Sequence, residues 1–241
     1  MIKQRHLLNQ QEFVTVEPLE VWFEELSTIT DNDWSLFEYS GEMLRDKMTN
    51  DEKLEMIQNS WNCGVVWAKK MKSEYNIDEL LPATSLASYL KLIVTDRIGK
   101  PTKYRMVFAQ FIMDDKIEII DEPIERYELL SKKSDILPSA QILKEILIAH
   151  EIFHFLEENN KLEMYTRNKT IKLWKLFNYE HRSTVNSNSE IAAMAFAKEL
   201  CGINFSPQVI NVLLSYPMEV DFSKKIYDNL MHGMKNLRPH A

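Results

Sequence analysis

Cysteine is scarce in this chain of 241 residues, which contains only Cys63 and Cys201. The two lie far apart in the sequence, and neither belongs to a Cys-x-x-Cys pair. Neither a disulfide framework nor a zinc site built from thiolates is therefore indicated. Both side chains are expected to be reduced thiols, as in cytoplasmic proteins.

The chain also lacks a surplus of positive charge and a long apolar run. It has 29 Lys and Arg against 36 Asp and Glu, a net charge of −7, so no overall basic field would attract nucleic acid or anionic lipid. No segment approaches the roughly 20 apolar residues that span a bilayer, and the N-terminal segment MIKQRHLLNQQEF lacks the apolar stretch of a signal peptide. We therefore expect a soluble cytoplasmic protein that binds neither membranes nor bulk nucleic acid. The sequence predicts no oligomeric state.

Glycine and proline are few, 5 and 8 respectively, and they are spread thinly. No flexible linker divides the chain, and we find no internal repeat. The sequence therefore predicts one domain over residues 1–241. Within it we expect a helical region over 1–100, a core over 101–210 that holds the motif described below, and a helical region over 211–241.

Hydrophobic spacing predicts helices in the first part of the chain. The stretches 18–26 and 33–45 are helix-like. Thr49 and Glu52 have the spacing of a capping box, so a long helix is expected to follow them as far as about Tyr75.

Signals for strands appear further along the chain. Residues 86–94 are apolar and predict a helix or a helix–strand element. Residues 104–120 are rich in β-formers with a polar break near their middle, which predicts two adjoining strands or a hairpin. Residues 121–135 look like connecting structure, and Ser139 can cap the helix that comes next.

That helix carries the segment His150-Glu151-Ile152-Phe153-His154, which is an H-E-x-x-H motif. Helix positions four apart lie about 40° apart around the axis and about 6 Å along it, so both imidazoles project to one side and can hold one ion. The histidines continue an apolar stripe and are expected to face the interior. That stripe consists of Leu143, Ile146 and Leu147. The alternative is two core histidines that are hydrogen-bonded to backbone or carboxylate groups.

The residue types in this motif suit metal-assisted hydrolysis. Neutral imidazoles are ligands for Zn²⁺, which lowers the pKa of a bound water toward about 7. Glu151 lies about 100° around the helix from His150, beside the position of such a water. A carboxylate there can take the proton of the water as it attacks a carbonyl and deliver it to the leaving amine. We therefore predict that His150 and His154 are metal ligands and that Glu151 is the general base.

A catalytic zinc site usually has three protein ligands and one open position. Glu157 and Asn160 stand where a metzincin would have its glycine and third histidine, so a glutamate from a second helix is the better candidate. Glu190 opens an alanine-rich segment that Gly202 ends, and such a narrow helix allows close approach to the histidines.

Glu190 also has an alternative interpretation, because Ser187-x-x-Glu190 is itself the pattern of a capping box. Four other glutamates are lesser ligand candidates, and each is also interpretable as a solvated surface charge. They are Glu157, Glu163, Glu180 and Glu199.

The order of these elements resembles the ImmA/IrrE family of zincin-like metallopeptidases over about residues 60–210. The resemblance rests on an early helix, strands before residue 120, the H-E-x-x-H motif and the helix that begins near Glu190. It implies an α+β, zincin-like fold, mainly helical, with a small mixed or antiparallel sheet beside the active-site helix. It also implies the gluzincin arrangement, in which two histidines and one downstream glutamate hold Zn²⁺.

The chain departs from the family pattern at several positions. Phe153 stands where the family usually has a small residue. Aligning Phe196-Ala197 on the pattern Glu-x-Glu-Ala-x-x-Phe-Ala puts Glu190 on the first Glu and Ala192 on the second, so either Glu190 supplies the ligand or the site is incomplete. In the Glu-x-x-Ala-Asp pattern of other gluzincins Glu190 is the ligand, but Met194 replaces the Asp that orients a histidine.

The segment 159–188 is locally basic in an acidic chain, and apolar residues are interleaved with its charges. This pattern predicts an amphipathic cover helix, with a lid or a surface for an acidic partner as the alternative. Three of its side chains are candidates to stabilise a tetrahedral oxyanion. They are Tyr165, Tyr179 and His181.

Taken together, these patterns predict a zinc-dependent metallopeptidase whose substrate is an intracellular protein or peptide. The predicted ligands are His150, His154 and Glu190, with Glu151 as the general base. The alternative is a catalytically inactive, zincin-like regulatory protein that binds a partner without hydrolysing it.

Overall fold

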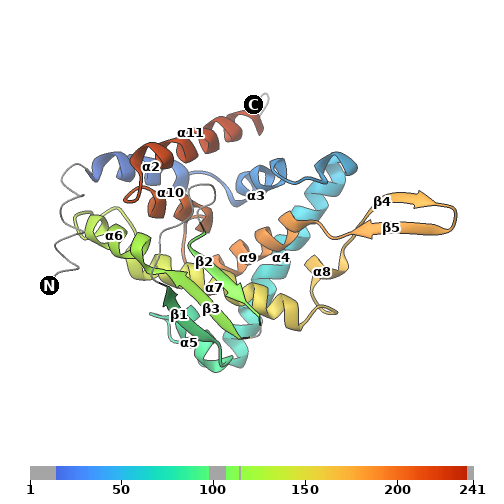
Figure 1. The fold of residues 1–241 in the computed structure, drawn as a ribbon, viewed down its shortest axis with the longest axis horizontal. Helices are drawn as coiled ribbons and strands as arrows, with labels where there is room; N and C mark the ends of the chain where they lie inside the picture. Colours follow the sequence, from blue (N-terminus) through green and yellow to red (C-terminus); the bar gives the residue numbers. More distant parts are fainter. Residues whose placement is uncertain (1–14, 98–106, 114, 238–241) are drawn as a thin grey trace.

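The protein combines helices with two small sheets, an α+β arrangement, in a computed structural model that describes residues 15–97, 107–113 and 115–237 (Figure 1). The earlier helices are α2 (Glu17–Ser27), α3 (Asp31–Ser40), the short 3-10 helix η1 (Arg45–Lys47), α4 (Asn50–Glu74) and α5 (Pro82–Tyr89). The later helices are α6 (Asp121–Ser131), α7 (Ala140–Asn159), α8 (Tyr165–Asn168), α9 (Asn186–Cys201), η2 (Pro207–Val209), α10 (Ile210–Ser215) and α11 (Val220–Leu237). The strands are β1 (Ile93–Arg97), β2 (Ala109–Ile112), β3 (Lys116–Ile120), β4 (Ile171–Leu176) and β5 (Tyr179–Ser183).

The first sheet is mixed and has three strands in the order β1-β3-β2. Strand β1 runs parallel to β3, while β2 runs antiparallel to β3 and forms an edge. Ile117 and Ile119 alternate along β3 and are fully buried, which fixes the face of the sheet that packs on the core. The sheet lies beside α7, so the expectation of a small mixed sheet next to the helix of the motif is confirmed (Figure 1).

Helix α4 begins as predicted. The Thr49 side chain accepts a hydrogen bond from the Glu52 backbone N–H, and the Glu52 carboxylate accepts one from the Thr49 backbone N–H. Further along, α4 packs closely against α9 at Gly64. A Cβ atom at Gly64 would lie 2.1 Å from the backbone oxygen of Ala192, so this approach requires glycine.

Helix α7, which carries the motif, is capped by Ser139, whose side chain accepts a hydrogen bond from the backbone N–H of Ile142. Leu143, Ile146 and Phe153 are buried on its inner face. Leu143 and Ile146 of the predicted stripe therefore pack on the core, whereas Leu147 is half-buried and lines the cavity described below.

Residues 86–94 contain a helix–strand junction, one of the two predicted forms. Helix α5 ends at Tyr89, and Lys91 adopts a left-handed backbone conformation with φ 59° before β1 begins at Ile93. Residues 104–106 and 114 of the predicted strand region lie outside the described residues, and the described remainder contains β2 and β3.

The prediction of connecting structure over residues 121–135 is wrong, because Asp121–Ser131 forms helix α6. Pro123 lies in the first turn, where proline is tolerated. The negative charge of Asp121 stabilises the helix, because it interacts favourably with the positive N-terminal end of the helix dipole. Tyr127 and Leu130 are buried on one face and hold the helix on the core.

The segment 159–188 is not a cover helix, and this prediction is also wrong. Apart from the short α8, its central part is the hairpin β4–β5, which extends away from the rest of the molecule (Figure 1). Ile171 at its base is buried, whereas Trp174, Phe177 and Tyr179 are exposed. The two lysines of β4 are three residues apart, so the hairpin shows no strict alternation, but aromatic residues such as Trp174 and Tyr179 favour strands.

In the part of the chain that the structure describes, no helix is both long and apolar enough to cross a membrane.

Candidate metal centre

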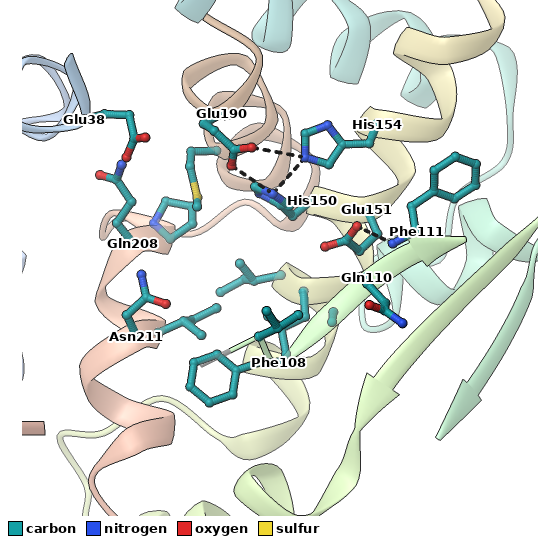
Figure 2. A pocket seen from close by; sticks show the side chains of 17 residues that line it. Glu38, Phe108, Gln110, Phe111, His150, Glu151, His154, Glu190, Gln208 and Asn211 are labelled. Carbon is teal, nitrogen blue, oxygen red and sulfur yellow. Dashed lines mark hydrogen bonds and ion pairs between the residues drawn. The ribbon is translucent and has the colours of Figure 1, made fainter. Parts of the chain in front are cut away.

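Three side chains from two helices converge at one point (Figure 2). The Nε2 atoms of His150 and His154, on α7, lie 3.0 Å apart. The carboxylate of Glu190, on α9, places one oxygen 3.5 Å from Nε2 of His150 and the other 3.9 Å from Nε2 of His154. One ligand atom from each residue lies within 4.8 Å of the other two. The structure thus brings together the three predicted metal ligands.

This geometry suits a zinc ion. Donor atoms about 2.1 Å from a tetrahedral zinc lie about 3.4 Å from one another. The three separations of 3.0, 3.5 and 3.9 Å surround this value. Two imidazoles and one carboxylate also form a donor set that is typical of catalytic zinc.

The packing of α7 against α9 fixes this geometry. Phe153, one residue before His154, is fully buried and lies with its ring centroid 5.7 Å from that of Phe196. Ala192 and Ala193 are also fully buried, so the first turns of α9 present small side chains to their neighbours. A large residue inside the motif is therefore accommodated by the core.

The interpretation of Ser187 and Glu190 as a capping box is wrong. Helix α9 begins at Asn186, and Val185 at its N-cap makes no side-chain capping bond. The backbone N–H of Ser187 instead donates to the Glu42 carboxylate, with 3.1 Å between N and Oε2. Glu42, from another part of the chain, thus accepts a hydrogen bond at this end of α9, and the carboxylate of Glu190 lies beside the histidines.

Glu151, the predicted general base, faces the same cavity and is anchored to the sheet. Its Oε2 accepts a hydrogen bond from the backbone N–H of Phe111 on β2, at 2.7 Å from N to O. The side chain is 8% exposed. This contact connects the edge strand of the sheet to the helix that carries the motif.

Glu157 supports His154 and is the main site residue that the sequence prediction missed. Its Oε2 lies 3.7 Å from Nδ1 of His154 and 2.7 Å from Oγ of Ser189, which itself lies 3.4 Å from the same Nδ1. Thr166 donates a further hydrogen bond, and Nη2 of Arg167 lies 3.2 Å away. The interpretation of Glu157 as a surface charge is wrong, because it is fully buried.

The pKa of Glu157 reflects these contacts. Burial on its own would raise the pKa, but hydrogen bonds from His154, Thr166 and Ser189, together with the charge of Arg167, lower it below 4.5. The signal in the sequence was its spacing of three from His154, which places both side chains on one side of α7. A carboxylate near Nδ1 leaves Nε2 available for a metal. Glu157 and Ser189 thus provide the support that Met194 cannot give.

His150 has a different environment. Its Nδ1 is buried and has no hydrogen-bond partner among the described residues. Burial lowers its pKa, but the carboxylates of Glu190, Glu151 and Glu38 outweigh this effect and raise the pKa above 6.5. The two histidines therefore differ at Nδ1: Glu157 and Ser189 lie near this atom of His154, whereas that of His150 has no partner among the described residues.

The site opens into a cavity of about 580 Å³. Its apolar lining is formed by Val107, Phe108, Ala109, Phe111, Ile146, Leu147, Met194, Pro207 and Ile210. Its polar and charged lining is formed by Glu38, Gln110, His150, Glu151, His154, Glu190, Gln208 and Asn211. Among the residues that the structure describes, this lining contains no lysine or arginine.

The other site candidates lie elsewhere. His181 contacts Trp174 in the hairpin, with ring centroids 5.3 Å apart and the ring planes tilted by 32°, and Tyr179 is also in the hairpin. Tyr165 is in α8, which packs against α4. None of the three candidate oxyanion stabilisers lines the cavity as the structure describes it.

The lesser ligand candidates are also outside this lining. Glu163 pairs with Lys70 at 3.8 Å, and Glu180 pairs with Lys175 at 3.8 Å. Glu199 lies near the C-terminal end of α9, far along that helix from Glu190.

Comparisons of the chain with protein-family models, with curated proteins and with solved structures found no match. The resemblance to the ImmA/IrrE family therefore rests on the order of motifs and stays a prediction. The evidence for a metal centre is the geometry of His150, His154 and Glu190.

Proposed function

We propose that this chain is a zinc-dependent metallopeptidase with a zincin-like fold, acting on an intracellular protein or peptide. One observation carries the proposal. His150, His154 and Glu190 form a group that could hold a metal ion, and Glu151 lines the same cavity.

The metal ligands in this proposal are His150, His154 and Glu190. A zinc ion held there would polarise a carbonyl and lower the pKa of a water molecule. Glu157 and Ser189 hold the ring of His154, because both lie close to its Nδ1. Coordination then involves Nε2, the atom that faces Glu190.

Glu151 acts as general base in this proposal. The N–H of Phe111 holds one of its oxygens, which leaves the other to accept a proton from the attacking water. The same carboxyl group then donates that proton to the leaving amine. Low exposure limits competition from bulk solvent for these hydrogen bonds.

A peptide substrate is supported by the position of β2. This strand is an edge of its sheet, and Ala109, Gln110 and Phe111 line the cavity. An extended peptide can pair with a strand edge through backbone hydrogen bonds. The N–H of Phe111 is already donated to Glu151, so such a peptide would pair with the remaining backbone groups of β2 and would run beside the histidines. The apolar part of the lining would receive its side chains.

A second candidate function is a regulatory protein that binds a partner without hydrolysing it. The hairpin β4–β5 favours this alternative, because Trp174, Leu176 and Tyr179 are 49%, 60% and 62% exposed. Exposed aromatic residues are enriched at protein interfaces.

Metal analysis and a pair of variants decide between the two candidates. We expect one zinc per chain in protein purified without chelators. Glu151→Gln should retain the zinc but lose about 100-fold or more of the hydrolysis of unstructured protein substrates, because the proton acceptor is gone. Glu158→Gln is the matched control, since Glu158 is on the same helix outside the cavity lining.

Three outcomes are informative. Absence of stoichiometric zinc contradicts the metal centre. Zinc binding without hydrolysis by the wild-type protein contradicts the peptidase and favours the regulatory alternative. Equal loss of activity in Glu151→Gln and Glu158→Gln contradicts the role of Glu151.

A further inference from the structure

We infer that Glu38 makes this cavity selective for substrates that carry a positive charge close to the scissile bond. The inference rests on the proposed function, because it concerns what binds beside the metal centre. The candidate groups are a lysine or arginine side chain and the free α-amino group of a peptide.

The first argument is a charge count. The described lining contains three carboxylates, on Glu38, Glu151 and Glu190, and no lysine or arginine. A zinc ion with two positive charges would be balanced by Glu151 and Glu190. The charge of Glu38 is then left over, and a cationic group of the substrate would balance it.

The second argument is position. Glu38 and Glu151 both line the cavity, and in Figure 2 Glu38 lies on the opposite side of His150 from Glu151. A carbonyl group at the metal centre would therefore have Glu151 on one side and Glu38 on the other. A substrate residue adjacent to the scissile bond extends toward Glu38.

The third argument is that Glu38 is held in a fixed place relative to the metal ligands. Near one end of α3, the Asp31 carboxylate pairs with Lys198 of α9 at 2.7 and 2.8 Å. Near the other end, the buried Tyr39 hydroxyl donates a hydrogen bond to the side chain of Asn188, also on α9. Because α9 carries Glu190, these contacts fix the part of α3 that carries Glu38 relative to the metal ligands.

The local environment agrees with an uncompensated charge. Burial, together with the charges of Glu190 and Glu42 and against the opposing effect of His150, raises the pKa of Glu38 from 4.5 to about 6. Pairing with a cation would offset both effects. A neutral or acidic substrate group beside Glu38 would offset neither the burial nor the repulsion by neighbouring carboxylates.

Peptide binding tests the inference without turnover. Zinc-loaded protein that keeps the Glu151 charge is titrated with fluorescent peptides of apolar sequence whose central amide is replaced by a neutral, non-hydrolysable ketomethylene group, and in which one lysine replaces norleucine at successive positions. A parallel set has the N-terminus either free or acetylated. These two sets distinguish a side chain from an α-amino group as the source of the charge.

We expect one cationic position to tighten binding about tenfold, as for a hydrogen-bonded charge pair. Adding Glu38→Gln should reduce this preference to less than about threefold. Glu24→Gln, an exposed residue of α2, removes the same charge outside the cavity and should leave the preference unchanged. An equal preference with and without Glu38→Gln, or no preference at all, overturns the inference.

The test separates this inference from the peptidase proposal. Hydrolysis by the wild-type protein with no charge preference overturns the role of Glu38 alone. A charge preference that depends on Glu38, in a wild-type protein that does not hydrolyse peptides, contradicts the peptidase and retains Glu38 as the recognition residue.

Discussion

Replacing Gly64 by alanine tests whether α4 and α9 approach each other as closely as the structure shows. The added Cβ would lie 2.1 Å from the backbone oxygen of Ala192, 2.8 Å from the backbone nitrogen of Phe196 and 2.9 Å from Cβ of Ala195. The two shortest contacts involve backbone atoms, which cannot rotate away as a side chain can. The helices would therefore have to separate by about 1 Å to restore normal contacts.

Two opposing effects determine the magnitude. Glycine to alanine in a helix interior is favourable by about 1 kcal/mol from backbone entropy. Overpacking of a core costs about 1–3 kcal/mol, and contacts with rigid backbone place this case at or above the upper end. We expect the free energy of unfolding to fall by about 2 kcal/mol. Because α9 carries Glu190, we also expect zinc affinity to fall by about tenfold.

Urea denaturation of the metal-free protein measures the first effect, and titration with zinc against a competing chelator measures the second. Gly41→Ala is the matched control, since its Cβ would meet only the backbone oxygen of Glu38, at an ordinary 3.5 Å. Its free energy of unfolding should change by less than about 0.5 kcal/mol. A Gly64→Ala protein as stable as the wild type would refute the close packing of α4 and α9.

Three further predictions follow from buried or half-buried carboxylates. Glu157→Gln should weaken zinc binding about 10- to 100-fold in a chelator competition, because His154 loses its charged support, whereas Glu24→Gln, at an exposed position of α2, should not. Glu145 is fully buried and accepts hydrogen bonds from two backbone N–H groups in the first turn of α5, so Glu145→Gln should cost about 2 kcal/mol in urea denaturation; unchanged stability would contradict this contact. Because the pKa of Glu38 rises from 4.5 to about 6 on folding, the metal-free native state loses stability as the pH rises through this window. Glu38→Gln should therefore gain up to about 2 kcal/mol over the wild type between pH 4.5 and 6 and keep that gain above it, and a difference that does not vary with pH would refute the shift.

The features that were predicted correctly depend on short stretches of sequence. The cap at Ser139, the capping box at Thr49 and the apolar stripe before His150 are all readable within one or two helical turns. The placement of His150 and His154 on one side of a helix follows from their spacing alone.

The features that were missed depend on distant segments. Glu157 is recognised as buried only once α8 and α9 have docked on α7, because in the sequence it resembles any glutamate near a helix end. The alternative cap at Ser187 was ruled out by Glu42, which belongs to another part of the chain. Helix α6 was missed because its acidic residues and Pro123 suggest a loop until its buried face is known.

The hairpin β4–β5 was missed for a local reason. The two lysines of β4 are three residues apart and give no period-two alternation, and the many charges in the wider segment suggested a solvated helix face. A β-bulge between Lys172 and Trp174 interrupts the alternation of side chains in this strand.

The position of this hairpin has a consequence for finding other proteins with the same centre. In the sequence the hairpin lies between His154 on α7 and Glu190 on α9. Its strands nevertheless extend away from these two helices (Figure 1). Surface hairpins tolerate lengthening and shortening at little thermodynamic cost. The number of residues between the second histidine and the glutamate is therefore free to vary among distant relatives, and searches based on a fixed interval would overlook them. A search that fixes only the two helices, with Glu157 at its place after His154, would retain them.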